Sequence, residues 1–224
     1  MKIHFGNIKR NVAAFFSAAW RQQLGKVLLC LCGALVITAA AIGIYLYNQG
    51  NAAEANAGRL LADYRQAQAS QETAQPYQPG ASEQAGHPVA VTVGGYQILG
   101  TLDIQKIGQT LPVISQTTDK ALTVSACYYV GALPGEQGNM VITGHDYADG
   151  SIFGSLNKLT VGDSVTLTGT DGKTYGYSVF AMDHINPDDL QALDDTTYAN
   201  ELSLLTCENN GNGRLLVRCR EVSA

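Results

Sequence analysis

The sequence predicts an all-β domain that follows an N-terminal transmembrane helix and a helical stalk. Two observations carry this prediction. An uncharged apolar run occupies residues 27–47, and short β-branched segments bounded by turn residues fill the chain from residue 89 to the end. Closely spaced strands with few helical patterns between them are typical of a small β-barrel or a β-sandwich.

The apolar run Val27–Tyr47 is long enough to cross a membrane. About 20 apolar residues, each rising 1.5 Å, span a hydrocarbon core of roughly 30 Å. Five Lys and Arg residues precede the run, and the first acidic residue is Glu54. Because positive residues flank the cytoplasmic side, residues 1–26 are predicted to be a cytoplasmic basic segment. A cleaved signal peptide is the alternative, but its apolar region would be shorter and nearer the start.

The part of the chain beyond this run is acidic. The whole chain has 14 Lys and Arg against 19 Asp and Glu, and without the five N-terminal cations nine remain, so the outer part carries a net charge of −10. Nucleic-acid binding depends on basic patches, so this composition argues against it. We therefore expect a single-pass plasma-membrane protein with its N-terminus in the cytoplasm and its folded domain outside the cell.

Residues 48–88 are predicted to form a stalk and a linker. Residues 54–71 are rich in Ala, Gln, Leu and Arg, as in a helix, whereas residues 73–88 (TAQPYQPGASEQAGHP) are rich in Pro, Gly, Gln and Ser, as in a linker. The remaining residues, 89–224, have the size of one domain.

Within this domain, several segments have the pattern of strands. VAVTV, YQILGTLDI, LPVI and NMVITG are short, β-branched and bounded by turns. The longer stretch SVTLTGTDGKTYGYSVFAM predicts a hairpin that turns at Asp171-Gly172. Short helices are expected near Ser151–Leu159 and Pro187–Leu193.

An odd number of cysteines lies outside the membrane. Cys30 and Cys32 fall in the apolar run, which leaves Cys127, Cys207 and Cys219. None of these three has the CxxC spacing of a zinc site, and an odd count leaves one thiol unpaired. The sequence therefore predicts no metal site and no cofactor, although carboxylates from separate loops leave calcium activation open. A leftover thiol on an exterior protein is a candidate nucleophile.

The stretch LSLLTCENNGNGRLLVRC (residues 202–219) predicts an antiparallel hairpin. Apolar residues alternate on both sides of ENNGNG, a tract whose Asn and Gly residues tolerate positive φ. This pairing places Cys207 and Arg214 opposite each other at the end of the hairpin. Arg218 and Arg220 lie further along the strand, where they are either solvated or face a groove.

A thiol nucleophile needs a base or a cation near the sulfur, because a free cysteine is mostly protonated at neutral pH. His145 follows an apolar strand and Gly144, which is a position where a side chain can enter a cleft. His184 lies at another strand end, and His87 lies in the linker. The pattern favours His145 over His184, but only slightly.

Three motifs of this domain resemble those of the sortases, the membrane-anchored cysteine transpeptidases of Gram-positive bacterial surfaces. LSLLTC resembles the family's TLxTC strand, with Ser203 in place of the usual Thr. RLLVR resembles the following strand, which begins with the family's catalytic arginine, and GNMVITGH resembles the strand that ends in Gly-His. LDIQKIGQTLPVI also resembles the entry strands of the sortase barrel. The likeness covers nearly all of the outer domain, in the family's order.

The resemblance implies an eight-stranded β-barrel over residues 89–224 and a defined reaction. A surface protein or pilin with an LPxTG-like sorting signal would bind as an extended peptide, and Cys207 would form a thioester with it. An amine of a cell-wall precursor or of a pilin lysine would then resolve the thioester. His145 would transfer the protons, Arg214 would hold the substrate and stabilise the oxyanion, and Thr206 would help to bind the substrate.

The motifs leave the subclass and two other functions open. GHDYADGSIFGSL resembles class B sortases, whereas LPGEQGNMVITGH and NKLTVGDSVTL resemble classes C, D and E. One alternative function is another extracellular cysteine peptidase, although His145 preceding Cys207 disfavours the papain-like order. The second is a non-catalytic, membrane-anchored β-module that binds a surface partner, in which Cys207 would be an ordinary core thiol.

Overall fold

The structure is a computed structural model of the chain, and it describes residues 6–74, 90–194, 198–208 and 211–222. Most of the expected linker, residues 75–88, lies outside the described residues, and so do residues 209–210 of the tract ENNGNG. The chain divides into two compact units, Met1–Leu46 and Tyr47–Ala224.

Helix α1 (Gly6–Ala74) contains the expected membrane span. Among the described residues, its segment Gly25–Ser70 is the one helix that is long and apolar enough to cross a membrane. Large apolar side chains of this segment are exposed, Leu29 by 75% and Ile37 by 71%. Exposed apolar side chains from Val27 to Tyr47 suit lipid rather than water, so the helix is consistent with a single membrane span.

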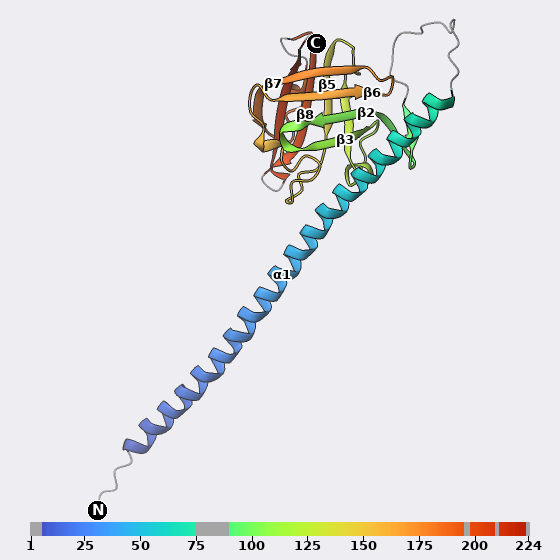
Figure 1. The fold of residues 1–224 in the computed structure, drawn as a ribbon. Coiled ribbons are helices and arrows are strands. Elements are labelled where there is room, and N and C mark those ends of the chain that lie inside the picture. The colour runs from blue at the N-terminus through green and yellow to red at the C-terminus, as the bar shows by residue number, and fades with distance from the viewer. Residues whose placement is uncertain (1–5, 75–89, 195–197, 209–210, 223–224) are drawn as a thin grey trace, which may run out of the picture. The chain divides into compact units, whose positions relative to one another are not determined.

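Among the described residues of the second unit, nine strands form one sheet, which closes into a barrel (Figure 1). The strand order is β1-β2-β3-β4-β5-β8-β9-β7-β6, and pairing of β2 with β6 closes the sheet. β1 pairs with the start of β2 beside this closure, so the closed barrel has the eight strands expected. The strands are β1 (Val91–Val93), β2 (Tyr96–Ile104), β3 (Gln109–Ile114), β4 (Ala126–Gly131), β5 (Gly138–Thr143), β6 (Ser164–Gly169), β7 (Thr174–Ile185), β8 (Asn200–Glu208) and β9 (Gly213–Glu221).

Parallel pairing of β5 with β8 determines which strand ends lie together. Met140 lies opposite Leu202, and Thr143 lies opposite Leu205. Parallel strands end at the same edge of a sheet, so the residues that follow β5 emerge beside the last residues of β8. The topology therefore brings two segments about 60 residues apart in the chain to one end of the barrel.

Alternation along β8 and β9 separates a core face from an outer face. Leu204 of β8 and Val217 of β9 lie opposite each other and are buried in the main core. The next pair, Leu205 and Leu216, points to the other face and belongs to a smaller apolar cluster. Cys207 follows Leu205 by two residues and so lies on the outer face.

The part of α1 that belongs to the second unit packs against the barrel. Ala53 and Ala57 belong to the main core, and Leu60 and Tyr64 belong to a second apolar cluster. The compact unit accordingly begins at Tyr47, whereas the sequence pattern places the start of the domain at residue 89. The difference arises because one face of the expected stalk helix is covered by the barrel rather than by water.

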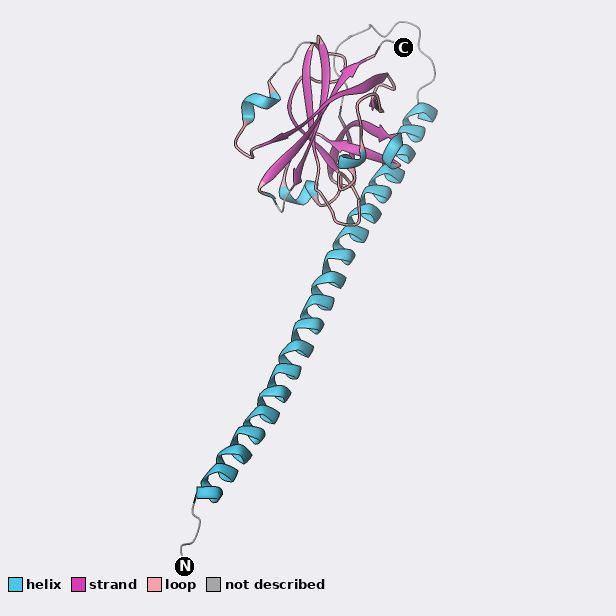
Figure 2. Cartoon of the chain, turned by 90° about the vertical axis from the view of Figure 1, so that its left-hand side faces the viewer, coloured by secondary structure: helices cyan, strands magenta, loops and turns pink. Residues whose placement is uncertain are grey.

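Short helical segments lie in the connections between strands (Figure 2). They are η1 (Gln105–Ile107), α2 (Asp119–Leu122), η2 (Leu156–Lys158) and η3 (Leu190–Leu193). Both η2 and η3 fall in segments where the sequence predicts helices, and each is a short 3₁₀ helix rather than an α-helix. α2 lies in a segment where the sequence pattern predicts no helix.

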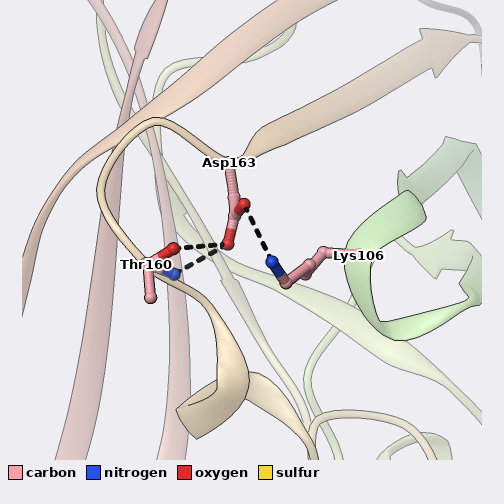
Figure 3. Close-up of polar contacts among 3 residues, drawn as sticks. All are labelled: Lys106, Thr160 and Asp163. Atoms are coloured by element: carbon pink, nitrogen blue, oxygen red, sulfur yellow. Dashed lines mark hydrogen bonds and ion pairs between the residues drawn. The ribbon is translucent and has the colours of Figure 1, made fainter.

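A carboxylate fixes the turn that precedes β6 (Figure 3). Asp163 accepts hydrogen bonds from the N–H and the hydroxyl of Thr160 at 2.8 and 3.0 Å, and its other oxygen lies 3.7 Å from Nζ of Lys106. The bond from the Thr160 N–H is the main reason why the pKa of Asp163 is lowered. Since Lys106 belongs to η1, directly after β2, this contact supports the pairing that closes the barrel.

Candidate active site

The β8–β9 hairpin places a thiol opposite a guanidinium. Cys207 pairs with Arg214, and Arg214 pairs on its other side with Ile185 of β7. Residues directly opposite each other in neighbouring strands share one face of the sheet, so all three lie on the outer face. Cys207 and Arg214 are both half-buried. This is the pairing that the alternation in the sequence predicts.

His145 reaches the same end of the barrel from β5. The N–H of Gly144 donates to the carbonyl of Leu205 at 3.2 Å, and the hydroxyl of Thr206 donates to the carbonyl of Gly144 at 2.8 Å. The carbonyl of His145 accepts a hydrogen bond from the N–H of Phe153 at 3.0 Å. The backbone around His145 is therefore held by β8 on one side and by its own loop on the other.

The loop that follows His145 is strained and partly buried. Ile152 has a φ of 53°, an outlier for a β-branched residue, and its side chain is 1% exposed. Asp146 forms a β-bridge with Ile152, and the ring of Tyr147 packs edge-on against that of His145 with centroids 5.4 Å apart. Burial of Ile152 maintains this conformation, which limits the orientations open to His145.

One cavity of about 250 Å³ is lined by His145, Cys207 and Arg214 together. A second cavity of about 760 Å³ adjoins it, since the two have lining residues in common. The shared residues are Tyr129, Leu190 and Leu193. We call the two cavities the groove, and we call η3 (Leu190–Leu193) the groove wall. The groove runs over the outer face of the strands that carry the thiol.

The other candidate base, His184, lies on the opposite face. It pairs with Leu215, which pairs in turn with Thr206, the residue before Cys207. Successive residues of a strand point to opposite faces. Its Nδ1 lies 2.7 Å from Oε2 of Glu208. The structure thus separates the two histidines that the sequence pattern hardly distinguishes.

Arg214 is bonded to its own turn. Its Nη1 donates to the carbonyls of Gly211 and Gly213 at 3.0 and 2.9 Å. A guanidinium carries five N–H donors, and the three that do not belong to Nη1 are on Nε and Nη2. The turn therefore anchors one nitrogen of the fork while the side chain lines the groove.

Thr206 is buried on the core face, next to Cys207 in the chain. Its hydroxyl donates to the carbonyl of Gly144, which links β8 to the residue before His145. The expected contact of Thr206 with substrate stays a prediction.

The other thiols outside the membrane span are buried in the barrel. Cys127 and Cys219 are both 0% exposed, and all five cysteines are free. Burial raises the pKa of Cys127 to about 12 and raises the pKa of Cys219 as well. Neither is suited to nucleophilic attack, which requires an accessible thiolate. Among the described residues, no group of three or more His, Cys, Asp and Glu side chains is arranged to hold a metal ion.

His145 should make the stability of the fold depend on pH. Burial lowers its pKa from the ordinary 6.5, and the negative charge of Asp119 opposes this effect. The unfolded chain therefore binds a proton more tightly than the folded chain, so stability is lost as the pH falls below 6.5 towards the lowered pKa. We expect the wild type to lose stability relative to His145→Gln between pH 7.5 and 5, measured by urea unfolding.

Asp119→Asn provides the second arm of this measurement. Removing the carboxylate should lower the pKa of His145 further and enlarge the loss of stability at pH 5. Parallel stability curves for the wild type and His145→Gln would contradict the burial of a neutral imidazole.

A protein-family model of the sortase domain matches residues 102–222, which is more than half of the chain. The chain belongs to the sortase family. The matched range contains His145, Cys207 and Arg214 and the whole barrel from the middle of β2 onward. Membership agrees with the closed eight-stranded barrel and with the order of the motifs along the chain.

Several known sortases are similar to this chain. Sortase A of Bacillus anthracis is 27% identical over 112 residues, which cover 50% of this chain and 52% of that protein. The chain thus spans about half the length of the curated relative it matches. Among solved structures, Sortase C of Streptococcus pneumoniae is 27% identical with a TM-score of 0.53, covering 75% of this chain and 90% of that one. The Sortase D5 transpeptidase of Clostridium perfringens, at 20% identity, covers 77% and 99% with a TM-score of 0.54 and shows the shared fold.

Of the two residues that hold the groove wall, sequence reasoning missed Asn139 and left Arg218 as either solvated or facing a groove. Asn139 of β5 donates to the carbonyl of Leu193 at 3.0 Å, and Arg218 of β9 donates to the carbonyl of Ala192. A signal for Arg218 was available, since it shares a strand face with Arg214 at a spacing of four residues. No comparable signal points to Asn139, whose partner is 54 residues away.

Proposed function

We propose that this chain is a membrane-anchored sortase-type transpeptidase that cleaves an LPxTG-like sorting signal and transfers the acyl group to an amine. The observation that carries the proposal is the cavity lined by His145, Cys207 and Arg214, which opens along the groove. An extended peptide lying in this groove would bring one carbonyl carbon to the sulfur. The apolar lining from Tyr129 and the groove wall suits the Leu and Pro side chains of such a signal.

The proposed reaction has two acyl-transfer steps. His145 takes the proton of the Cys207 thiol as the sulfur attacks the carbonyl carbon, the C–N bond of the peptide breaks, and His145 gives this proton to the departing amine. The acceptor amine then attacks the thioester, its proton passes to His145, and the C–S bond breaks as His145 returns this proton to the sulfur. In both steps the oxygen of the tetrahedral intermediate carries negative charge, which the fixed donors of Arg214 would stabilise.

The proposed substrates are sorting-signal-bearing surface proteins or pilins, and the proposed acceptor is an amine of a cell-wall precursor or of a pilin lysine. The similar Sortase C of S. pneumoniae is described in terms of pilin substrate specificity, which supports pilins as one substrate class. The basic residues before the apolar helix support an N-terminus in the cytoplasm and a catalytic unit outside.

The proposal is tested with the full chain in detergent, a panel of LPxTG-like peptides and a short glycine peptide as the amine. We expect cleavage before the last residue of the signal, a new amide with the added amine, and hydrolysis when the amine is left out. Mass spectrometry identifies each product and the thioester on Cys207. A thiol reagent first shows, in a separate sample, that Cys207 is accessible. If the unlabelled protein then cleaves none of the peptides, the result counts against the proposal.

Gly144→Ala should lower the rate by about tenfold to a hundredfold, the cost of misplacing a catalytic group by about 1 Å. A Cβ at this position would lie 2.9 Å from the side chains of Ile152 and Phe153, so the backbone before His145 must shift. Gly176→Ala is the matched control, because a Cβ there would make an ordinary contact of 3.6 Å with Val222. The measurement compares the rates of peptide turnover by the two variants. Equal rates would mean that the loop adapts without moving His145.

A further inference from the structure

The groove wall is only partly packed: Ala192 and Leu193 contact the apolar cluster of Val141, Leu205 and Leu216, whereas Leu190 and Gln191 are exposed. η3 is a short 3₁₀ helix of four residues, all of them exposed or half-buried, and Leu190 is 60% exposed. Leu190 and Leu193 nevertheless line both cavities of the groove. Contacts from outside the segment must therefore set its position over the outer face of β5 and β8.

Two polar side chains from the strands of the sheet supply such contacts to the groove wall. They act on successive backbone carbonyls of the wall: Arg218 donates to that of Ala192, and Asn139 donates to that of Leu193. The two donors come from different strands, β9 and β5. The C-terminal half of the groove wall is thus held by two strands, β5 and β9, which lie on either side of β8.

Arg218 is itself oriented by a carboxylate. Its Nε lies 3.2 Å from Oδ2 of Asp183 on the neighbouring strand β7, and its side chain is only 18% exposed. A guanidinium can contact two acceptors at once through its fixed fork, which an ammonium group cannot do in the same geometry. Arg218 therefore joins β7, β9 and the groove wall through one side chain.

We propose that Arg218 is a positioning residue that holds the groove wall in the conformation that binds the sorting-signal peptide. The inference rests on the proposed function, since it concerns the same groove. Without Arg218, the wall spends less time in the binding conformation, and the apparent affinity falls by the fraction of molecules that are competent. The chemistry at Cys207 is unchanged once the peptide is bound, so the effect falls on KM and not on kcat.

The test compares Arg218→Met with Arg220→Met in the full chain in detergent. Arg220 is a matched control because it lies two residues on, on the same face of β9, and its guanidinium packs over the ring of Tyr198, 5.3 Å from the ring centroid. For the LPxTG-like peptide that the wild type cleaves best, Arg218→Met should raise KM by about tenfold, the usual effect of losing a charge-assisted hydrogen bond. Its kcat should stay within about twofold, and Arg220→Met should match the wild type.

A second measurement is independent of activity. Hydrogen exchange, followed by mass spectrometry of a fragment covering residues 186–194, should be faster in Arg218→Met than in the wild type and unchanged in Arg220→Met. Asp183→Asn keeps Arg218 but removes its carboxylate partner, so it should show the same changes to a smaller degree. This variant carries the test if Arg218→Met does not fold.

The outcomes separate the inference from the proposed function. An active wild type with unchanged KM and unchanged exchange in Arg218→Met overturns the role of Arg218 and leaves the proposed function intact. A loss of kcat at constant KM also overturns it, because Arg218 would then act in the chemistry. If the wild type cleaves no peptide, the proposed function fails, and faster exchange in Arg218→Met still supports the anchoring of the wall.

Discussion

Cys207→Ala is expected to abolish detectable peptide cleavage, a loss of at least about 10⁴-fold, as for removal of other catalytic nucleophiles. Without the sulfur there is no thioester, and the two-step path reduces to direct attack by the amine or by water. The fold should persist, because Cys207 is half-buried at the groove and not packed in the main core. Product formation and the mass of the covalent intermediate are the two readouts.

Cys127→Ala and Cys219→Ala are the controls for this prediction. Both thiols are fully buried, so each substitution should lower the stability of the barrel and leave turnover by the folded fraction close to that of the wild type. Unchanged cleavage by Cys207→Ala would assign the nucleophile to another residue. Complete loss of activity in folded Cys219→Ala would show that the wrong thiol had been chosen.

The hairpin that carries the thiol could be predicted from local pattern alone. Two-residue alternation in LSLLT and LLVRC fixes which side chains share a face, and the turn tract between them fixes the register. Both features are properties of adjacent residues. The structure accordingly shows Cys207 opposite Arg214, as expected.

The choice of histidine depends on topology, which local pattern does not contain. His145 and His184 both end apolar strands, yet β5 runs parallel to β8 whereas β7 lies beyond β9. Only the strand order shows that His145 emerges beside Cys207 and that His184 points to the other face. In the sequence, His145 is favoured clearly only by its resemblance to the family's Gly-His motif, because composition and spacing hardly distinguish it from His184.

The packing of the stalk helix against the barrel could not be predicted from local pattern, for a related reason. The apolar residues of the stalk, such as Leu60 and Tyr64, are few and interspersed with Ala and Gln, which is typical of an exposed helix. In the structure these two side chains are 5% and 1% exposed because the barrel covers them. Burial against a distant surface leaves little trace in a short helical pattern.

Arg214→Lys is the second substitution with a large expected effect, a loss of about 10²–10³-fold in kcat, as for removal of an oxyanion donor. Lysine keeps the charge but replaces a planar fork by a single flexible ammonium group. In this structure Nη1 of Arg214 is already bonded to the carbonyls of Gly211 and Gly213. A lysine can therefore either bond to the turn or approach the substrate, whereas arginine can do both.

Arg220→Lys on the same strand is the matched control, since it makes the same chemical change outside the groove and should leave turnover unchanged. Separate values of kcat and KM for Arg214→Lys then identify what Arg214 does. A fall in kcat with a similar KM would mean that the guanidinium acts on the charge that develops in the transition state, and a rise in KM alone would mean that it only holds the peptide. Wild-type turnover in folded Arg214→Lys would remove Arg214 from the chemistry, and the tether to the turn would then be its whole role.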